Sequence, residues 1–187
     1  ETKRWDELAT HLGETADRMG GIERAKLLVR LGDVQEEHLG EGARAVANYA
    51  RALELVATDE GARAGLRRLV KSDATRRAAV DALLAVFVSE SESEAILSLT
   101  EDRLLAAPGD DERVAILVET SRIRDEKTED LAGAFTDARR AFPFAKRAPA
   151  DARFAAQIRR KSFEFARAPL AGEFSVVAID PPLGGDV

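Results

Sequence analysis

The triplet Glu36-Glu37-His38 contains residue types that bind transition metals. The helical Glu-x-x-His motif of di-iron bundles would need a glutamate at position 35, where this chain has Gln35. The spacing therefore favours a solvated helix end, with His38 near the negative end of the helix dipole. The only other histidine, His11, lies next to Leu12 at the boundary of an apolar helix face, a position that is typical of a packing residue.

Two acidic runs, at 110–112 and 128–130, lack the Asp-x-Asp-x-Asn-Gly pattern of calcium loops. Acidic residues of this kind are favoured in the first turn of a helix. The chain has no cysteine, which excludes disulfides, Cys-based metal sites and a thiol nucleophile. It also lacks the H-E-x-x-H, G-x-S-x-G and G-x-x-x-x-G-K-[ST] motifs. The sequence predicts no enzyme, no metal and no cofactor.

Composition indicates the kind of element that must hold these residues. The 187 residues carry a net charge of −6, with 45% hydrophobic, 33% charged and only 5% aromatic residues. The apolar mass is mostly Ala, Leu and Val, which favours closely packed helices over a β-sandwich. No apolar run approaches the ~18 residues of a membrane span, and residues 1–4 begin no signal peptide. We expect a cytoplasmic location, for a processed chain or an excised piece of a longer protein.

Apolar residues recur at three-and-four spacing, which predicts an all-α chain of about nine helices. The expected helices cover 4–19, 25–39, 45–56, 62–70, 79–87, 95–104, 114–123, 131–138 and 152–165. Their expected caps are Ser72-Asp73, a Ser91/Glu94 capping box and Thr128, with Pro143 as a breaker. Beyond them, 168–187 is punctuated by Pro and Gly and predicts an extended tail.

An internal repeat is the main signal. Sliding the chain along itself by 89 residues gives nine identities over the thirty positions from Glu23 to Ala52 without a gap. This offset suits two helix pairs in each copy. We expect one repeat domain over 1–167, with copies near 4–72 and 91–161.

Within the first copy, large and small residues follow a fixed pattern. Its members are Leu28, Leu31, Gly32, Gln35, Ala45, Tyr49 and Ala52. The corresponding residues that pack the second copy are Leu117, Ala134, Ala138 and Ala141. The pattern resembles the tetratricopeptide repeat (TPR), with three departures: Gln35 for a tyrosine, Ala57 for a proline, and an extra residue near Leu39. Residues 4–142 also resemble the degenerate TPR arrays of large bacterial proteins from high-GC genomes.

The resemblance implies a right-handed α-solenoid of antiparallel helix pairs that serves as a binding scaffold without a shared active site. A partner protein or peptide would bind the concave face, lined by the first helix of each pair, near Gln35 and Arg124. One alternative is a structural spacer or docking module of a larger assembly.

Charge patterning offers a second binding hypothesis. Basic residues gather at Arg63, Arg67, Arg68, Lys71, Arg76 and Arg77, and again at Arg139, Arg140, Lys146, Arg147, Arg159, Arg160 and Lys161. These clusters predict an acidic partner, or else exposed faces paired with neighbouring carboxylates. A nucleic-acid-binding repeat is disfavoured because the clusters lack interleaved aromatics.

Phenylalanines crowd the C-terminal third of the chain, from Phe142 to Phe174. This distribution predicts either a locally thicker core or an apolar end that docks onto a further repeat, a missing domain or a second copy.

Overall fold

The computed structural model describes residues 2–145, and within this range every regular element is an α-helix. The helices are α1 (Thr2–Arg18), α2 (Gly21–Glu37), α3 (Gly42–Leu55), α4 (Glu60–Leu69), α5 (Arg76–Ser89), α6 (Ser93–Ser98), α7 (Thr100–Ala106), α8 (Asp110–Lys127) and α9 (Leu131–Ala145). The predicted all-α class is confirmed for this part of the chain. None of the described helices is long and apolar enough to cross a membrane. The expected helix at 152–165 and the expected tail at 168–187 lie outside the described residues.

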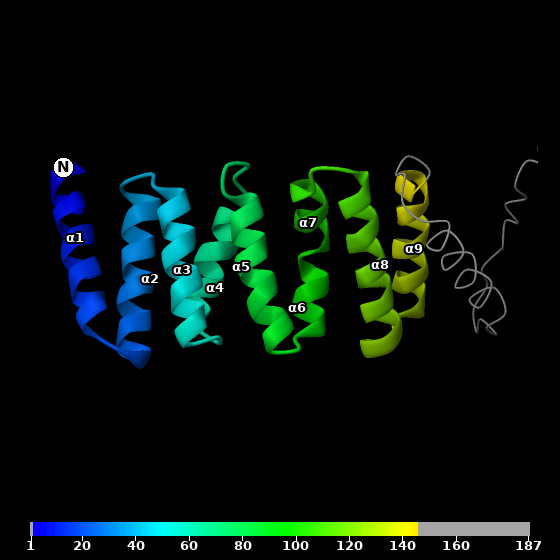
Figure 1. Cartoon of the computed structure of the whole chain (residues 1–187), viewed down its shortest axis with the longest axis horizontal. Helices are drawn as coiled ribbons and strands as arrows, with labels where there is room; N and C mark the ends of the chain where they lie inside the picture. The colour runs from blue at the N-terminus through cyan, green and yellow to red at the C-terminus, as the bar shows by residue number, and fades with distance from the viewer. Residues whose placement is uncertain (1, 146–187) are drawn as a thin grey trace, which may run out of the picture.

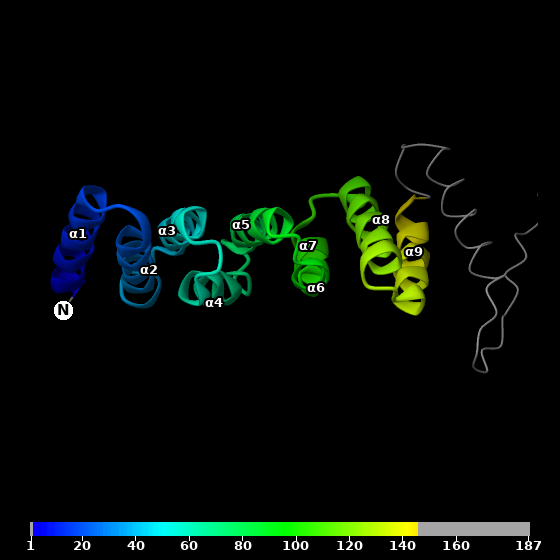
Figure 2. The ribbon, with the colours of Figure 1, turned by 90° about the horizontal axis from the view of Figure 1, so that it is seen from below.

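The helices stand side by side in one row (Figure 1). Each contacts only helices one or two places away in the row, counting α6 and α7 as one place because they follow each other end to end. Among the described helices, the backbone of α1 packs closely on α2 alone and that of α9 on α8 alone, while ion pairs reach one helix further, from α1 to α3 and from α9 to α7. Seen from below, α3 and α5 lie on one side of the row, and α4, α6 and α7 lie on the other (Figure 2). The fold is therefore built from contacts between near neighbours.

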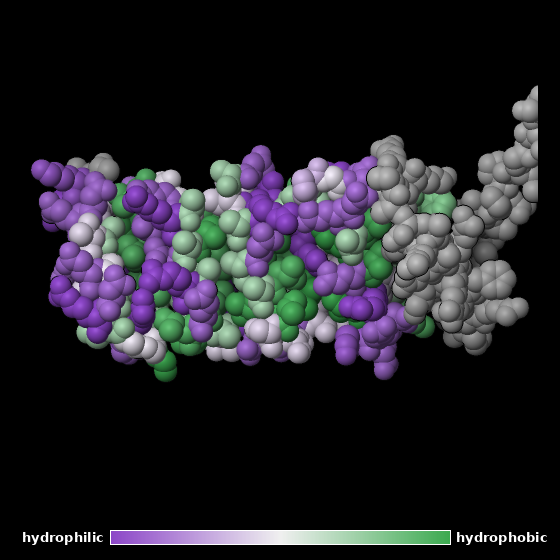
Figure 3. Space-filling model, in the orientation of Figure 1, coloured by the Kyte–Doolittle hydropathy of each residue, from purple (hydrophilic) through white to green (hydrophobic). Residues whose placement is uncertain are grey.

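The hydrophobic core runs along the row in three clusters. The largest joins α2 to α6 around Leu28, Tyr49, Leu66 and Phe87. A second packs α1 on α2, and a third packs α8 on α9 around Leu117. On the face shown in Figure 3, polar residues gather over α1 while hydrophobic residues show over the middle of the row. The outer surface of α1, with Asp6, Glu7, Thr10 and Glu14, is open and charged.

The residues expected to pack the repeat are buried. They are Leu28, Leu31, Gly32, Ala45, Tyr49 and Ala52 in α2 and α3, and Leu117, Ala134, Ala138 and Ala141 in α8 and α9. A Cβ on Gly32 would lie 2.6 Å from Tyr49 Cε1, and one on Gly65 would lie 2.4 Å from Tyr49 Cζ. The Tyr49 ring thus fills the junction of α2, α3 and α4, and only glycine leaves room for it.

The predicted sixth helix, 95–104, is wrong as a single helix, because it divides into α6 and α7 at Leu99. Hydroxyl groups compete for the carbonyls there: Ser98 Oγ donates to Ala95 O at 2.6 Å and Thr100 Oγ1 to Leu97 O at 2.7 Å. Such side-chain bonds replace regular helical bonds and interrupt the helix. The two short helices follow each other end to end (Figures 1 and 2).

The three expected caps are also wrong. Ser91 has a φ of 58° and lies in the turn before α6, whose N-cap is Glu92, so the capping box does not form. Thr128 instead ends α8, and the carboxylate of Asp130 accepts from the Gly133 N–H at 2.9 Å. Thr75, not Ser72-Asp73, immediately precedes α5.

The expected break at Pro143 is likewise wrong, because α9 continues to Ala145. Proline has no backbone N–H, so Pro143 cannot donate to the carbonyl four residues earlier, that of Arg139. Here only two residues of α9 follow Pro143.

Two helix pairs share one local geometry. The first pair, α2/α3, begins its helices at Gly21 and Gly42; the second pair, α8/α9, begins them at Asp110 and Leu131. Both steps equal the sequence offset of 89 residues (110 − 21 and 131 − 42). Gly20 and Gly109, also 89 apart, are extended N-caps of α2 and α8.

The turns inside the two pairs also match. Gly40 has a φ of 66° and Glu129, 89 residues later, a φ of 55°, so glutamate adopts the left-handed conformation that glycine favours. Equivalent backbone hydrogen bonds close both turns. In the first turn, Leu39 N–H donates to Val34 O at 3.2 Å and Glu41 N–H donates to Gln35 O at 2.8 Å. In the second turn, Thr128 N–H donates to Ile123 O at 3.3 Å and Asp130 N–H donates to Arg124 O at 2.9 Å. The two turns are one structure used twice.

The interval between the two pairs differs from the expected two helix pairs. It contains α4 and α5, and then the α6–α7 segment as an additional rod. The additional rod reverses the chain direction, so that α2 runs upward and α8 downward in Figure 1. The second pair is consequently inverted relative to the first along the row.

Candidate functional site

The two histidines, which are the candidate metal ligands of the sequence, do not form a metal site in the described residues. The His38 ring stacks on the Trp5 ring with centroids 3.7 Å apart, which joins the end of α2 to α1. His11 is exposed on α1. Within residues 2–145, no group of three or more histidines or carboxylates is arranged to hold a metal ion.

The acidic runs also serve the helices. Asp110, Asp111 and Glu112 form the first turn of α8, where the helix dipole favours negative charge. Glu112 additionally pairs with Arg77 of α5 at 2.6 Å, across the α6–α7 segment.

Polar groups meet at the Tyr49 hydroxyl, between the first pair and α4. The hydroxyl oxygen lies 2.7 Å from Asp33 Oδ1 and 2.9 Å from Glu36 Oε2, both on α2. Arg68 of α4 donates to that oxygen at 3.2 Å and to Glu36 Oε2 at 2.7 Å. The buried ring and its polar end therefore tie three helices together.

The charges of this cluster shift its ionisation. Burial, with the neighbouring carboxylates of Asp33 and Glu36, holds the pKa of Tyr49 well above its usual range. Hydrogen bonding to Glu36 raises the pKa of Arg68. The phenol consequently stays protonated and the guanidinium stays charged. The cluster therefore links α2, α3 and α4 by hydrogen bonds and does not have the ionisation of an acid–base pair.

Arg67 and Lys71, with the paired Arg68 beside them, form what we call the α4 basic edge. Arg67 is exposed, and its guanidinium carbon lies 5.8 Å from the centre of the Phe87 ring, a cation–π geometry. Lys71 is exposed just after α4, one helical turn beyond Arg67. In the part of the chain that the structure describes, neither cation forms an ion pair, which leaves two positive charges on this edge open to a ligand.

The remaining members of the first basic cluster are engaged. Arg63 is buried, and its guanidinium makes a bidentate ion pair with Glu92 at 2.7 and 3.1 Å. Arg76 pairs with Asp73, and Arg77 pairs with Asp81 and Glu112. The expectation that arginines pair with neighbouring carboxylates therefore describes these three residues, and the open charges belong to the α4 basic edge.

The interpretation of Gln35 as a peptide contact is replaced by one of helix packing. Gln35 is buried, with 7% of its surface exposed, and its Oε1 accepts from Asn48 Nδ2 at 2.7 Å. This bond joins α2 to α3 and uses the amide oxygen of Gln35 inside the helix pair.

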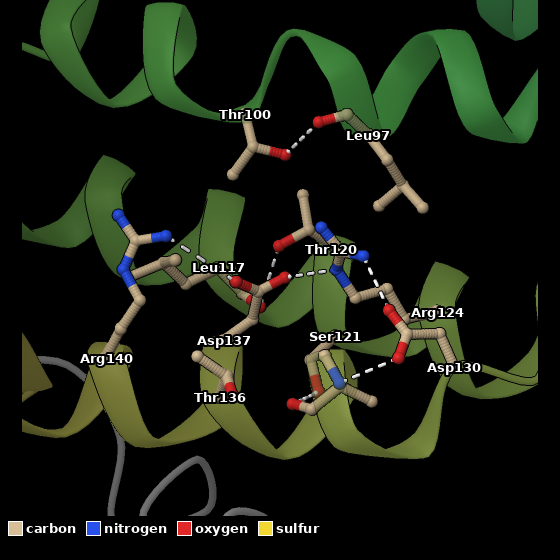
Figure 4. Close-up of polar contacts among 12 residues, drawn as sticks. Leu97, Thr100, Leu117, Thr120, Ser121, Arg124, Asp130, Thr136, Asp137 and Arg140 are labelled. Atoms are coloured by element: carbon tan, nitrogen blue, oxygen red, sulfur yellow. Dashed lines mark hydrogen bonds and ion pairs between the residues drawn. The ribbon is translucent and has the colours of Figure 1, made fainter.

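Arg124 lies 89 residues after Gln35 and makes the equivalent link in the second pair. Its Nε donates to Asp137 Oδ2 at 2.9 Å, and Asp137 stands 89 residues after Asn48 (Figure 4). Arg124 also donates to Asp130 at 2.7 Å. A neutral amide pair in the first helix pair is thus a charged pair in the second, and the part-exposed guanidinium of Arg124 is paired with two carboxylates of the α8/α9 pair.

The charged link extends to α7. Arg140 lies on the other side of Asp137 (Figure 4) and makes a bidentate pair with Glu101 of α7 at 2.7 and 2.9 Å. The hydrogen bonds from Arg140 hold the pKa of Glu101 below its usual range. Buried Arg103 of α7 pairs with Glu119 of α8 at 2.5 Å, while its Nη1 has no partner among the described residues. Ion pairs therefore fix α7, α8 and α9 to one another.

Sequence reasoning missed most of this network. The charged side chains of Asp137, Glu101 and Glu119 stand in ordinary amphipathic positions, and nothing in their spacing marks them. The 89-residue register alone offered a signal, since it aligns Asn48 with Asp137 and Gln35 with Arg124. Of the second basic cluster only Arg139 and Arg140 lie in the described range, and Arg139 is exposed.

Comparisons of the chain with models of protein families, with curated proteins and with solved structures find no match to any of them.

Proposed function

We propose that this chain is a TPR-like helical scaffold that binds another protein or peptide and carries out no catalysis of its own. The observation that carries the proposal is the row of helices in which each contacts only its near neighbours. Repeat proteins built in this way present long surfaces for partners, whereas a catalytic pocket needs groups that converge from several directions. The charged outer surface of α1 resembles the polar end that such arrays need to stay in solution.

The α4 basic edge is the surface we assign to the partner. Arg67 is held against Phe87 before any ligand arrives, so that binding costs little side-chain entropy. Lys71 adds a second cation one turn away, and neither charge is neutralised by a described carboxylate. An acidic peptide segment complements this edge, with salt-dependent attraction.

The test is a titration of the full chain with a fluorescein-labelled polyglutamate peptide, followed by fluorescence anisotropy. Arg67→Glu and Lys71→Glu are expected to weaken binding roughly 2- to 10-fold each, because each reverses one exposed charge. Arg18→Glu is the matched control: this arginine is exposed at the end of α1, away from α4, and its loss should leave affinity unchanged.

Equal weakening by Arg18→Glu, or no binding of polyglutamate at low salt, would contradict the assignment. A parallel titration with single-stranded oligo-dT separates the nucleic-acid alternative. If oligo-dT binds more tightly than polyglutamate with a steep salt dependence, the α4 basic edge binds nucleic-acid phosphates, and the proposal of a protein or peptide partner is contradicted.

A further inference from the structure

Four large, exposed apolar side chains lie at helix ends along one edge of the row. Met19 directly follows α1, Ile22 is in the first turn of α2, Leu55 is the last residue of α3, and Val88 is in the last turn of α5. They are 48%, 62%, 41% and 54% exposed, respectively. These helix ends all lie at the bottom of the row in Figure 1. We call the four positions the lower apolar edge; exposed apolar groups that gather in this way mark contact surfaces for other molecules.

Ion pairs and hydrogen bonds hold these helix ends in place. The buried guanidinium of Arg63 donates to Ala57 O, in the turn after α3, at 2.9 Å. The same guanidinium donates to the carboxylate of Glu92, in the turn after α5, at 2.7 and 3.1 Å. At the end of α1, Asp17 pairs with Arg51 of α3 at 3.8 Å. The turns that carry the lower apolar edge are therefore fixed to one another, and a ligand meets a surface that is already formed.

The charges beside the edge are negative and lack cations. Glu54 and Glu90 are exposed next to Leu55 and close to Val88, and neither forms an ion pair with a described residue. No lysine or arginine lies within two residues of either glutamate in the sequence. Glu54 is in the last turn of α3 and Glu90 is the C-cap of α5, where the helix dipole disfavours negative charge. The fold gains nothing from these two carboxylates, whereas a cation brought by a ligand would neutralise them.

We propose that the lower apolar edge binds a cationic amphipathic segment of a partner protein. Aliphatic side chains of the partner pack on Leu55 and Val88, and the rest of the edge extends this apolar contact toward α1. Lysine or arginine side chains of the partner pair with Glu54 and Glu90. Burial of apolar surface supplies the affinity, and the carboxylates select a basic partner. The α4 basic edge lies near the far end of α4, so this surface is separate from the one assigned above and has the opposite charge.

The charge contacts are tested with a fluorescein-labelled amphipathic peptide of leucine and lysine, titrated into the full chain and followed by fluorescence anisotropy. Glu54→Lys and Glu90→Lys should each weaken binding roughly 2- to 10-fold, because each reverses one exposed charge. Glu7→Lys, which makes the same change on the exposed surface of α1, should leave the affinity unchanged. Absence of peptide binding, or equal weakening by Glu7→Lys, would overturn the proposal.

The apolar contacts have their own control. Leu55→Gln and Val88→Gln should each weaken the leucine–lysine peptide roughly 2- to 10-fold, because each removes one aliphatic contact. Leu105→Gln, at an exposed leucine near the end of α7 and at the other edge of the row, should not. Polylysine of equal length should bind more weakly than the leucine–lysine peptide. Equal affinity for the two peptides, or equal weakening by Leu105→Gln, would contradict an apolar docking surface.

Two further measurements separate binding from folding and from self-association. Because Glu54 and Glu90 oppose the helix dipoles, Glu54→Gln and Glu90→Gln should raise the unfolding midpoint by up to about 4 °C while they weaken the peptide. A lowered midpoint would assign the carboxylates to the fold and overturn the proposal. Sedimentation equilibrium of the chain alone should show no association that Leu55→Gln abolishes; such an association would assign the lower apolar edge to a second copy.

Discussion

Gly65 faces the ring of Tyr49, and its replacement by alanine tests whether α3 and α4 meet as described. A Cβ at this position would lie 2.4, 2.5 and 2.8 Å from Cζ, Cε2 and Cε1 of the ring, well inside van der Waals contact. The ring has little freedom to move aside, because its hydroxyl is bonded to α2 and to Arg68.

Two effects of opposite sign decide the magnitude. Overpacking of a well-filled core costs about 1–3 kcal/mol. Alanine in a helix interior recovers about 0.5–1 kcal/mol relative to glycine. With three ring atoms closer than 3.0 Å, overpacking wins, and Gly65→Ala should lose about 1–2 kcal/mol of stability. For a chain of this length the unfolding midpoint should fall by about 2–8 °C.

Gly13 of α1 provides the matched control. A Cβ there would meet only Leu31 Cδ2, at 3.8 Å, which is ordinary contact. Gly13→Ala therefore keeps the helix gain without the clash and should raise the midpoint by about 1–4 °C. Thermal unfolding followed by circular dichroism measures both variants. If Gly65→Ala were to raise the midpoint as Gly13→Ala does, the packing of Tyr49 between α2 and α4 would be refuted.

Three further outcomes are expected. Tyr49 is the only tyrosine, and its pKa is raised in the folded chain, so the stability it contributes should be intact below the unfolded pKa of about 10 and fall above that pH. Phenolate absorbance should therefore appear only when the chain unfolds. A smooth phenol titration near pH 10 with the helices intact would contradict the raised pKa. The lowered pKa of Glu101 contributes stability above about pH 4.3 that is lost as the pH falls through the folded pKa. In Glu101→Gln, the urea unfolding midpoint should therefore depend less on pH below about pH 4.3. An unchanged pH dependence of the midpoint would argue against the ion pair with Arg140. Arg63→Ala should cost roughly 2–4 kcal/mol in urea unfolding, because it strips Glu92 of a buried partner; a loss below about 1 kcal/mol would show that the pair is not formed.

Much of the helical framework could be predicted from periodicity, because buried positions such as Leu28, Tyr49 and Leu117 recur at the spacing of one helix face. The break at Leu99 could not, since it depends on which hydroxyl bonds which carbonyl, and Ser98 and Thr100 are common in unbroken helices as well. The turn at Glu129 was equally hidden. Nothing in a glutamate signals a left-handed residue; the equivalent Gly40 carries that signal in the first pair alone.

The residues proposed for binding were harder to predict than the fold. Residue type alone does not distinguish Gln35, whose side chain is buried in a hydrogen bond with Asn48, from Lys71, which is exposed without an ion pair to any described residue. Arg68 and Arg67 are adjacent in sequence, yet one turns toward the carboxylates of α2 and the other toward Phe87. These differences arise from the helices that pack on each side of α4, which a single sequence does not place.

The helix pairs α2/α3 and α8/α9 are one structural unit used twice, joined across its two helices by Gln35–Asn48 in one copy and Arg124–Asp137 in the other. The most direct measurement is to place the first link in the second position and to determine free energies of unfolding in urea. Arg124→Gln alone and Asp137→Asn alone should each cost about 1–3 kcal/mol, because each leaves a mismatched partner between the helices. The double variant should be more stable than the sum of the two single losses predicts, since the amide pair already fits this geometry, although the bond from Arg124 to Asp130 stays lost. A double variant as unstable as the sum of the two single variants would contradict the equivalence of the two pairs.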